Sequence, residues 1–140
     1  MKNSIILLLT VFILSCATPP QQQISDVKNK LIGEWSSVDQ SGKQGSFIFY
    51  KDGNADMVIE GKPMEDENIK LIYFFDSSKE PMELDLIYVD NFNNEWVLMR
   101  GIVQFLTDNK IKIRSFFNDN RPEGFLAKDD NNTLILLKSK

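Results

Sequence analysis

From Gly33 onward, apolar and polar residues alternate with a period of two, the pattern of β-strands that bury one face. The alternation is clearest in Met82–Val89 and recurs in Lys110–Phe117. Asp, Asn, Gly and Pro interrupt the runs at short intervals and mark tight turns. Gly101, inside the longest run, is expected at a bulge or bend. The predicted strands are Gly33–Val38, Ser46–Lys51, Ala55–Glu60, Ile69–Phe75, Met82–Val89, Glu95–Leu106, Lys110–Phe117, Gly124–Lys128 and Thr133–Lys138.

One short helix is predicted before the first strand. Ile24, Val27 and Leu31 recur at helical spacing. Ser25 occupies an N-cap position and Gly33 follows the last turn, which gives a helix of about two turns. About 8–9 strands with no second helix predict an all-β fold, an antiparallel up-and-down β-barrel, because closure removes the exposed edges of a long meander. A two-sheet sandwich has the same periodicity and stays open as the alternative.

The start of the chain predicts an exported lipoprotein. Residues 1–15 are expected to be a signal peptide, because Lys2 precedes roughly ten apolar residues, too few to span a bilayer. The run ends at Ser15-Cys16, which resembles a bacterial lipobox and implies that Cys16 is the site of lipid attachment. Residues 16–23 are then a lipid-anchored tether, and residues 24–140 one barrel domain. Ala17 resembles an outer-membrane address, so we expect a location in the bacterial cell envelope, at the outer membrane.

Composition narrows the class of function. The chain has 20 acidic and 16 basic residues, a net charge of −4 and no histidine. The negative balance argues against nucleic-acid binding, which needs a basic face. The absence of histidine excludes a Ser-His-Asp triad and removes the commonest metal ligand. No phosphate-binding glycine loop or zinc-binding motif is present. We therefore expect neither an enzyme nor a metal or cofactor site.

Several short motifs resemble a known family. Leu31-Ile32-Gly33-Glu34-Trp35 contains the G-x-W that opens lipocalin-like barrels, in which the Trp closes one end. The motifs that follow are similar in order to those of an uncharacterised lipocalin-like domain family frequent in planctomycetes; they are Tyr73–Asp76, Pro81–Leu86, Arg100–Val103, Lys110–Ile113 and Asn120–Phe125. The resemblance implies a lipocalin-like barrel and brings no activity with it. Lys138 stands in place of the arginine that usually stacks on the Trp.

Large side chains on the predicted strands are the candidates for ligand binding or for the barrel interior. A barrel that holds an apolar ligand should contain an enclosed pocket of at least about 300 Å³. Its candidate lining residues are Trp35, Phe49, Tyr73, Leu86 and Phe117. The same side chains suit a filled lumen equally well. Arg100 and Arg114 are candidates for pairing with an interior carboxylate or for stacking on Trp35, and the alternative for both is a solvated position on the surface.

Other charged residues receive structural expectations. Asp85 shares a face with Glu83, because residues two apart in a strand point the same way, and we expect both to face solvent. Arg121 lies in a predicted turn, where we expect it to pair with Asp119 or Glu123. The acidic segments 64–67 and 129–132 are expected to be solvated turns rather than calcium loops.

Two functions fit these observations. The first is a membrane-anchored barrel that binds a small apolar ligand or an envelope component. The alternative is an interaction or inhibitor module with a filled core, whose loops contact a partner protein. An apolar cavity inside the barrel separates the two.

Overall fold

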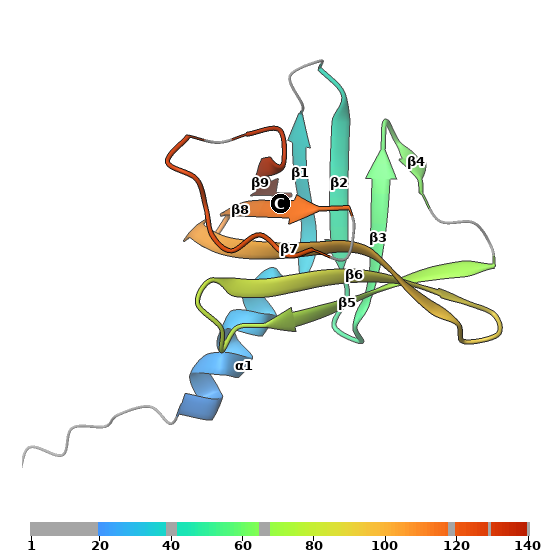
Figure 1. Ribbon diagram of the computed structural model, residues 1–140, viewed down its shortest axis with the longest axis horizontal. Helices are drawn as coiled ribbons and strands as arrows, with labels where there is room; N and C mark the ends of the chain where they lie inside the picture. The colour runs from blue at the N-terminus through green and yellow to red at the C-terminus, as the bar shows by residue number, and fades with distance from the viewer. Residues whose placement is uncertain (1–19, 39–41, 65–67, 118–119, 129, 140) are drawn as a thin grey trace, which may run out of the picture.

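The structure, a computed structural model, describes residues 20–38, 42–64, 68–117, 120–128 and 130–139. It is all-β: eight antiparallel strands form a closed barrel, joined by one extra strand and one helix (Figure 1). The elements are α1 (Pro20–Leu31), β1 (Gly33–Val38), β2 (Gln44–Phe49), β3 (Asn54–Ile59), β4 (Lys62–Pro63), β5 (Ile69–Asp76), β6 (Met82–Asp90), β7 (Glu95–Thr107), β8 (Lys110–Phe116) and β9 (Thr133–Lys138).

Strand pairing closes the barrel, as predicted. Each strand of the ring pairs with the next along the chain, β9 returns to β1, and the two-residue β4 pairs with β3 outside the ring. Two of the pairings within the ring are short. The β9–β1 pairing joins Trp35 to Lys138 and Ser36 to Leu137, and the β3–β5 pairing also spans two residue pairs. The barrel therefore consists of a β1–β3 sheet and a β5–β9 sheet that cross steeply and meet at two short seams (Figure 1).

The alternation of residues located most strands well. β1 and β9 have the predicted bounds, and six other strands lie within two residues of theirs. The predicted strand Gly124–Lys128 is wrong: this segment follows bends and joins no sheet in the part of the chain that the structure describes. Residues 120–128 and 130–132 instead run over the outer surface of the barrel, and we call them the strap.

The helix is longer than predicted. It begins at Pro20 rather than after Ser25, so residues 20–23, expected in the tether, are helical. Proline suits the first turn of a helix, because its fixed φ is already helical and its missing N–H has no partner to lose. Leu31 is buried and Val27 packs against the core, so the last two turns dock on the barrel. Within the described residues, no helix combines the length and apolar character needed to cross a membrane.

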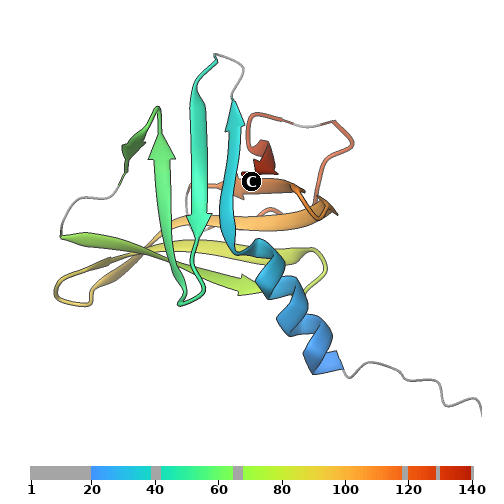
Figure 2. The same cartoon turned by 180° about the vertical axis from the view of Figure 1, so that it is seen from behind.

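Trp35 and the C-terminal turn of the helix fill one end of the barrel. Trp35 is fully buried there, edge-on to Phe105, just beyond the C-terminus of α1. We call this the closed end, and the opposite end, where β1 and β3 finish, the mouth (Figure 2). Large apolar side chains fill the lumen from the closed end; they include Trp35, Phe49, Leu71, Leu84, Leu86, Met99, Ile111, Ile113 and Leu136.

Gly101 is not at a bulge, contrary to expectation. It pairs regularly with Leu84 and Ser115, and the irregularities of β7 fall on either side of it. An added Cβ would lie 3.2 Å from the carbonyl oxygens of both Leu84 and Arg114. Glycine is needed because the neighbouring strands come close, and not because the chain bends.

Candidate functional site

A half-open apolar pocket of about 370 Å³ lies at the mouth of the barrel. It forms where the upper part of the β1–β3 sheet diverges from the ends of β8 and β9. Its lining includes Ser37, Gly45, Phe47, Met57, Phe117 and Leu134. The volume falls within the range of small-molecule sites, about 300–1,000 Å³.

The size of the inward-facing side chains explains why the cavity begins at this level. Trp35 and Phe47 are cross-strand partners and fill the lumen below the pocket. The next inward-facing pair towards the mouth is Ser37 and Gly45. Ser37 contributes only a hydroxymethyl group, and Gly45 has no side chain. Two small residues follow two aromatic ones, and the volume that they leave empty is the pocket.

The rim of the pocket carries polar groups beside the apolar wall. Lys43 lines the pocket, and its Nζ lies 3.9 Å from Glu60 Oε2. Ser46 also contributes to the lining and is itself buried. Such a site favours an apolar ligand body with polar contacts at one edge.

Four predicted lining residues belong instead to the filled core. Trp35, Phe49, Tyr73 and Leu86 are all buried within the core cluster. None of them lines the pocket at the mouth. The Tyr73 hydroxyl donates to the Tyr50 carbonyl oxygen at 2.8 Å, so its polar atom is used within the fold. Burial, with a smaller contribution from the Asp52 charge, raises the pKa of Tyr73.

Phe117 does line the pocket, but at its outer edge. The residue is 65% exposed, so of the two predicted positions it occupies the pocket lining and not the barrel interior. The pocket is open on that side, whereas we had expected an enclosed one. Cys16, the predicted site of lipid attachment, lies outside the described residues.

At the closed end, Trp35 and Lys138 cap the helix. Trp35 Nε1 donates to the Leu31 carbonyl oxygen at 2.6 Å, and Lys138 Nζ donates to that of Lys30 at 2.8 Å. The Lys138 ammonium also lies 5.0 Å from the centre of a Trp35 ring. Its positive charge is favourable beside the carbonyl end of a helix. Burial lowers the pKa of Lys138.

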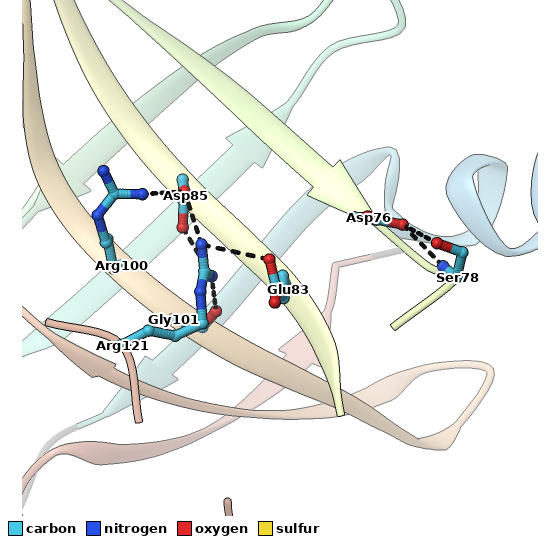
Figure 3. A network of polar contacts seen from close by, with 7 residues as sticks. All are labelled: Asp76, Ser78, Glu83, Asp85, Arg100, Gly101 and Arg121. Atoms are coloured by element: carbon cyan, nitrogen blue, oxygen red, sulfur yellow. Dashed lines mark hydrogen bonds and ion pairs between the residues drawn. The ribbon is translucent and has the colours of Figure 1, made fainter. Parts of the chain in front are cut away.

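The two candidate arginines point outward, so the interpretation that placed them in the interior or on Trp35 is wrong and the surface alternative agrees with the structure. Arg100 Nη1 donates to Asp85 Oδ2 at 2.9 Å on the outer face of the sheet (Figure 3). Arg114 Nη1 donates to the Gly124 carbonyl oxygen at 2.9 Å, and its Nη2 contacts Asp130 at 3.1 Å. The hydrogen bond from Arg114 to the Asp130 carboxylate is the largest cause of the lowered pKa of Asp130.

Asp85 is buried rather than exposed to solvent. It faces outward, as the alternation predicted, but the strap covers it, and only 7% of its side chain is accessible. Arg121 of the strap donates from Nη2 to Asp85 Oδ2 at 2.8 Å and lies 3.4 Å from Glu83 Oε2 (Figure 3). Arg121 therefore pairs with Asp85 and Glu83 rather than with Glu123, and Asp119, the other expected partner, lies outside the described residues. The strand face was predicted correctly, and the segment above it was not.

The described residues contain no group of three or more histidine, cysteine or acidic side chains placed to hold a metal ion. The site therefore offers shape and apolar surface, with a few polar atoms at its edge.

Comparison with known proteins adds no relative. No protein-family model, curated protein or solved structure matches this chain. The residues themselves are the basis for any functional argument.

Sequence reasoning missed most of the pocket. Phe47, Met57 and Leu134 lie in predicted strands, but they were not singled out among the other apolar positions. The usable signal was the pair Ser37 and Gly45, small residues at inward positions of two strands otherwise lined by aromatic side chains. Recognising it requires the register between the two strands, which the alternation alone does not provide.

Proposed function

We propose that this chain is a lipocalin-like binding barrel, anchored in the bacterial cell envelope, that takes up a small apolar ligand at its mouth. The observation that supports the proposal is the apolar pocket of about 370 Å³ above a filled core. Its open side allows exchange without unfolding of the barrel. The proposed role is binding and not catalysis, in agreement with a chain that has no histidine.

The anchoring part of the proposal depends on the sequence before α1. An apolar run that ends at Cys16 and is followed by polar residues suits a lipoprotein, and two acyl chains hold a protein on a membrane stably. We expect Cys16→Ser to abolish labelling by radioactive palmitate and to release the protein from the membrane fraction. Unchanged labelling or fractionation of the variant would show that Cys16 is not the anchor.

The binding part is tested with N-phenyl-1-naphthylamine, an uncharged apolar probe whose fluorescence rises in apolar surroundings. The chain from residue 20 onward contains every described element and leaves out the apolar residues 5–14, which would bind the probe by themselves. We expect saturable binding of one probe molecule. Phe117→Ser should lower the affinity for the probe by about fivefold to tenfold, because the loss of one aromatic wall of the pocket costs roughly 1 kcal/mol of binding free energy.

Phe92→Ser is the matched control. Phe92 is also an exposed phenylalanine, at 86%, but it lies in the β6–β7 hairpin and does not line the pocket. We expect this variant to bind the probe as the wild type does. Equal weakening by both substitutions, or the absence of saturable binding to the wild type, would refute the proposed site.

The filled lumen favours a second candidate function. Because large side chains occupy the lower barrel, and Val38, Met64 and Phe117 are exposed, the protein also suits an interaction or inhibitor module that contacts a partner through its loops. The probe titration separates the two, because this second function predicts no saturable uptake of an apolar molecule.

A further inference from the structure

We propose that the strap regulates access to the mouth pocket, and that the ionic contacts of Arg121 with Asp85 hold it in its docked position. The inference rests on the proposed ligand-binding function and adds a control element to the same site. Its basis is a partly buried charge network, centred on the buried Asp85, that joins the strap to the outer face of the barrel (Figure 3).

The first attachment runs from the strap into the sheet. Arg121 Nη1 donates to the Gly101 carbonyl oxygen at 2.7 Å and lies 2.8 Å from Asp85 Oδ1, while its Nη2 donates to Asp85 Oδ2. Arg100 contacts the same carboxylate from the neighbouring strand. Next to Arg121 in the chain, Pro122 is buried beside Ile102. The guanidinium therefore joins one strap residue to two strands at once.

The second attachment runs in the opposite direction. Arg114 of β8 reaches into the strap, where it contacts the Gly124 carbonyl oxygen and Asp130. Close by, the Ser115 amide donates to the Asn132 carbonyl oxygen at 3.0 Å. Both halves of the strap are thus tied to the same outer surface.

The strap and the pocket are continuous along the chain. Phe117, which lines the pocket, lies four residues before Arg121, and Leu134, which also lines it, comes two residues after the strap ends. Four residues of extended chain reach at most about 14 Å, so the docking of Arg121 limits where Phe117 can lie. Release of the strap would free both ends of one pocket wall.

The chemistry of the attachment suits a reversible contact. A buried ion pair gains little over apolar packing of the same volume, because both charges lose their hydration. The best-attested use of such groups is to choose between alternative arrangements. Here the charged contacts hold a segment without regular secondary structure against a sheet whose own core is complete without it.

The test is Arg121→Gln, read by two measurements. Asp85 keeps Arg100 as a partner in this variant, so the barrel should still fold. We expect N-phenyl-1-naphthylamine to dissociate about tenfold faster in stopped-flow fluorescence. A tenfold change corresponds to a loss of 1.4 kcal/mol in the free energy that holds the strap in its docked position. Hydrogen exchange of the Ser115 amide, which bonds to Asn132, should accelerate by a similar factor, while amides between β6 and β7 keep their rates.

Asp108→Asn is the matched control. It breaks the ion pair with Lys30 at 2.9 Å, which is exposed and lies away from the strap, and we expect no change in either measurement. If the Ser115 amide and the β6–β7 amides accelerate equally, Arg121 only stabilises the whole fold and the inference is wrong. It is also wrong if the wild type binds the probe and Arg121→Gln leaves the dissociation rate unchanged. A wild type that does not bind the probe refutes the proposed function itself, and this inference with it.

Discussion

Gly101→Ala tests the close approach of strands in the centre of the β5–β9 sheet. The added Cβ would lie 3.2 Å from two backbone carbonyl oxygens, those of Leu84 and Arg114, and 3.3 Å from Ser115 Cβ. Ordinary carbon–oxygen contacts are a few tenths of an ångström longer. Both oxygens belong to strands paired with β7 on either side, so neither can yield without disturbing a ladder.

The expected cost follows from these contacts. Extra volume in a close-packed interior costs about 1–3 kcal/mol. Alanine regains about 0.5–1 kcal/mol over glycine in a strand, because it loses less backbone entropy on folding. We expect Gly101→Ala to lower the free energy of unfolding by about 1–2 kcal/mol, which corresponds to a melting temperature roughly 3–8 °C lower.

Gly45→Ala is the matched control for this substitution. Gly45 is also a strand glycine without positive φ, but its added Cβ would meet one atom, the Val58 carbonyl oxygen, at an ordinary 3.8 Å. We expect unchanged stability or a gain of up to about 1 kcal/mol. Urea unfolding followed by circular dichroism measures both variants. If Gly101→Ala is as stable as Gly45→Ala, the close approach does not exist and a flexible bend at Gly101 becomes the better explanation.

Two further outcomes are expected. Trp35→Phe should lower the free energy of unfolding by about 2 kcal/mol in urea, because it leaves the buried Leu31 carbonyl oxygen without its donor, whereas the half-exposed Trp96→Phe should change it little. In an NMR titration Asp90 should have a pKa below the ordinary value near 3.9, because Asn94, first through its side chain, donates hydrogen bonds to the carboxylate. The ionised Asp90 carboxylate then stabilises the fold fully above the ordinary pKa, and this stabilisation is lost as the pH falls through the lower pKa of the folded state. Asn94→Ala should move the pKa of Asp90 back up. An unchanged pKa in that variant would contradict the assignment.

The fold was largely readable from the sequence because each strand has one dry face. Alternation of residues depends on local geometry, so it located β1, β5, β6 and β9 without knowledge of their partners. The strand predicted at Gly124–Lys128 was wrong. In this segment Phe125 contacts Lys112 from outside the barrel, and no strand of the described sheet pairs with it. A short apolar segment that packs on an outer face has the composition of a strand without the pairing.

The site was less predictable, for a related reason. The alternation of residues correctly placed Asp85 on the outward face of β6. An outward-facing side chain is exposed, however, only if no other segment covers that face. The cover comes from Arg121, 36 residues away in sequence. The pocket likewise depends on the register of Ser37 with Gly45 and on two sheets that diverge above a short seam. These are tertiary facts, and no local pattern encodes them.

The helix and the mouth occupy opposite ends of the barrel, and this arrangement determines in which direction the pocket opens relative to the N-terminus of the helix. The twelve-residue helix is about 18 Å long and leads away from the closed end, so Pro20 lies on the side of the barrel opposite to the mouth. If Cys16 carries the proposed lipid anchor, the membrane lies on the side of the closed end and the mouth opens away from it. The proposed ligand would then be exchanged on the side of the barrel that faces away from that membrane.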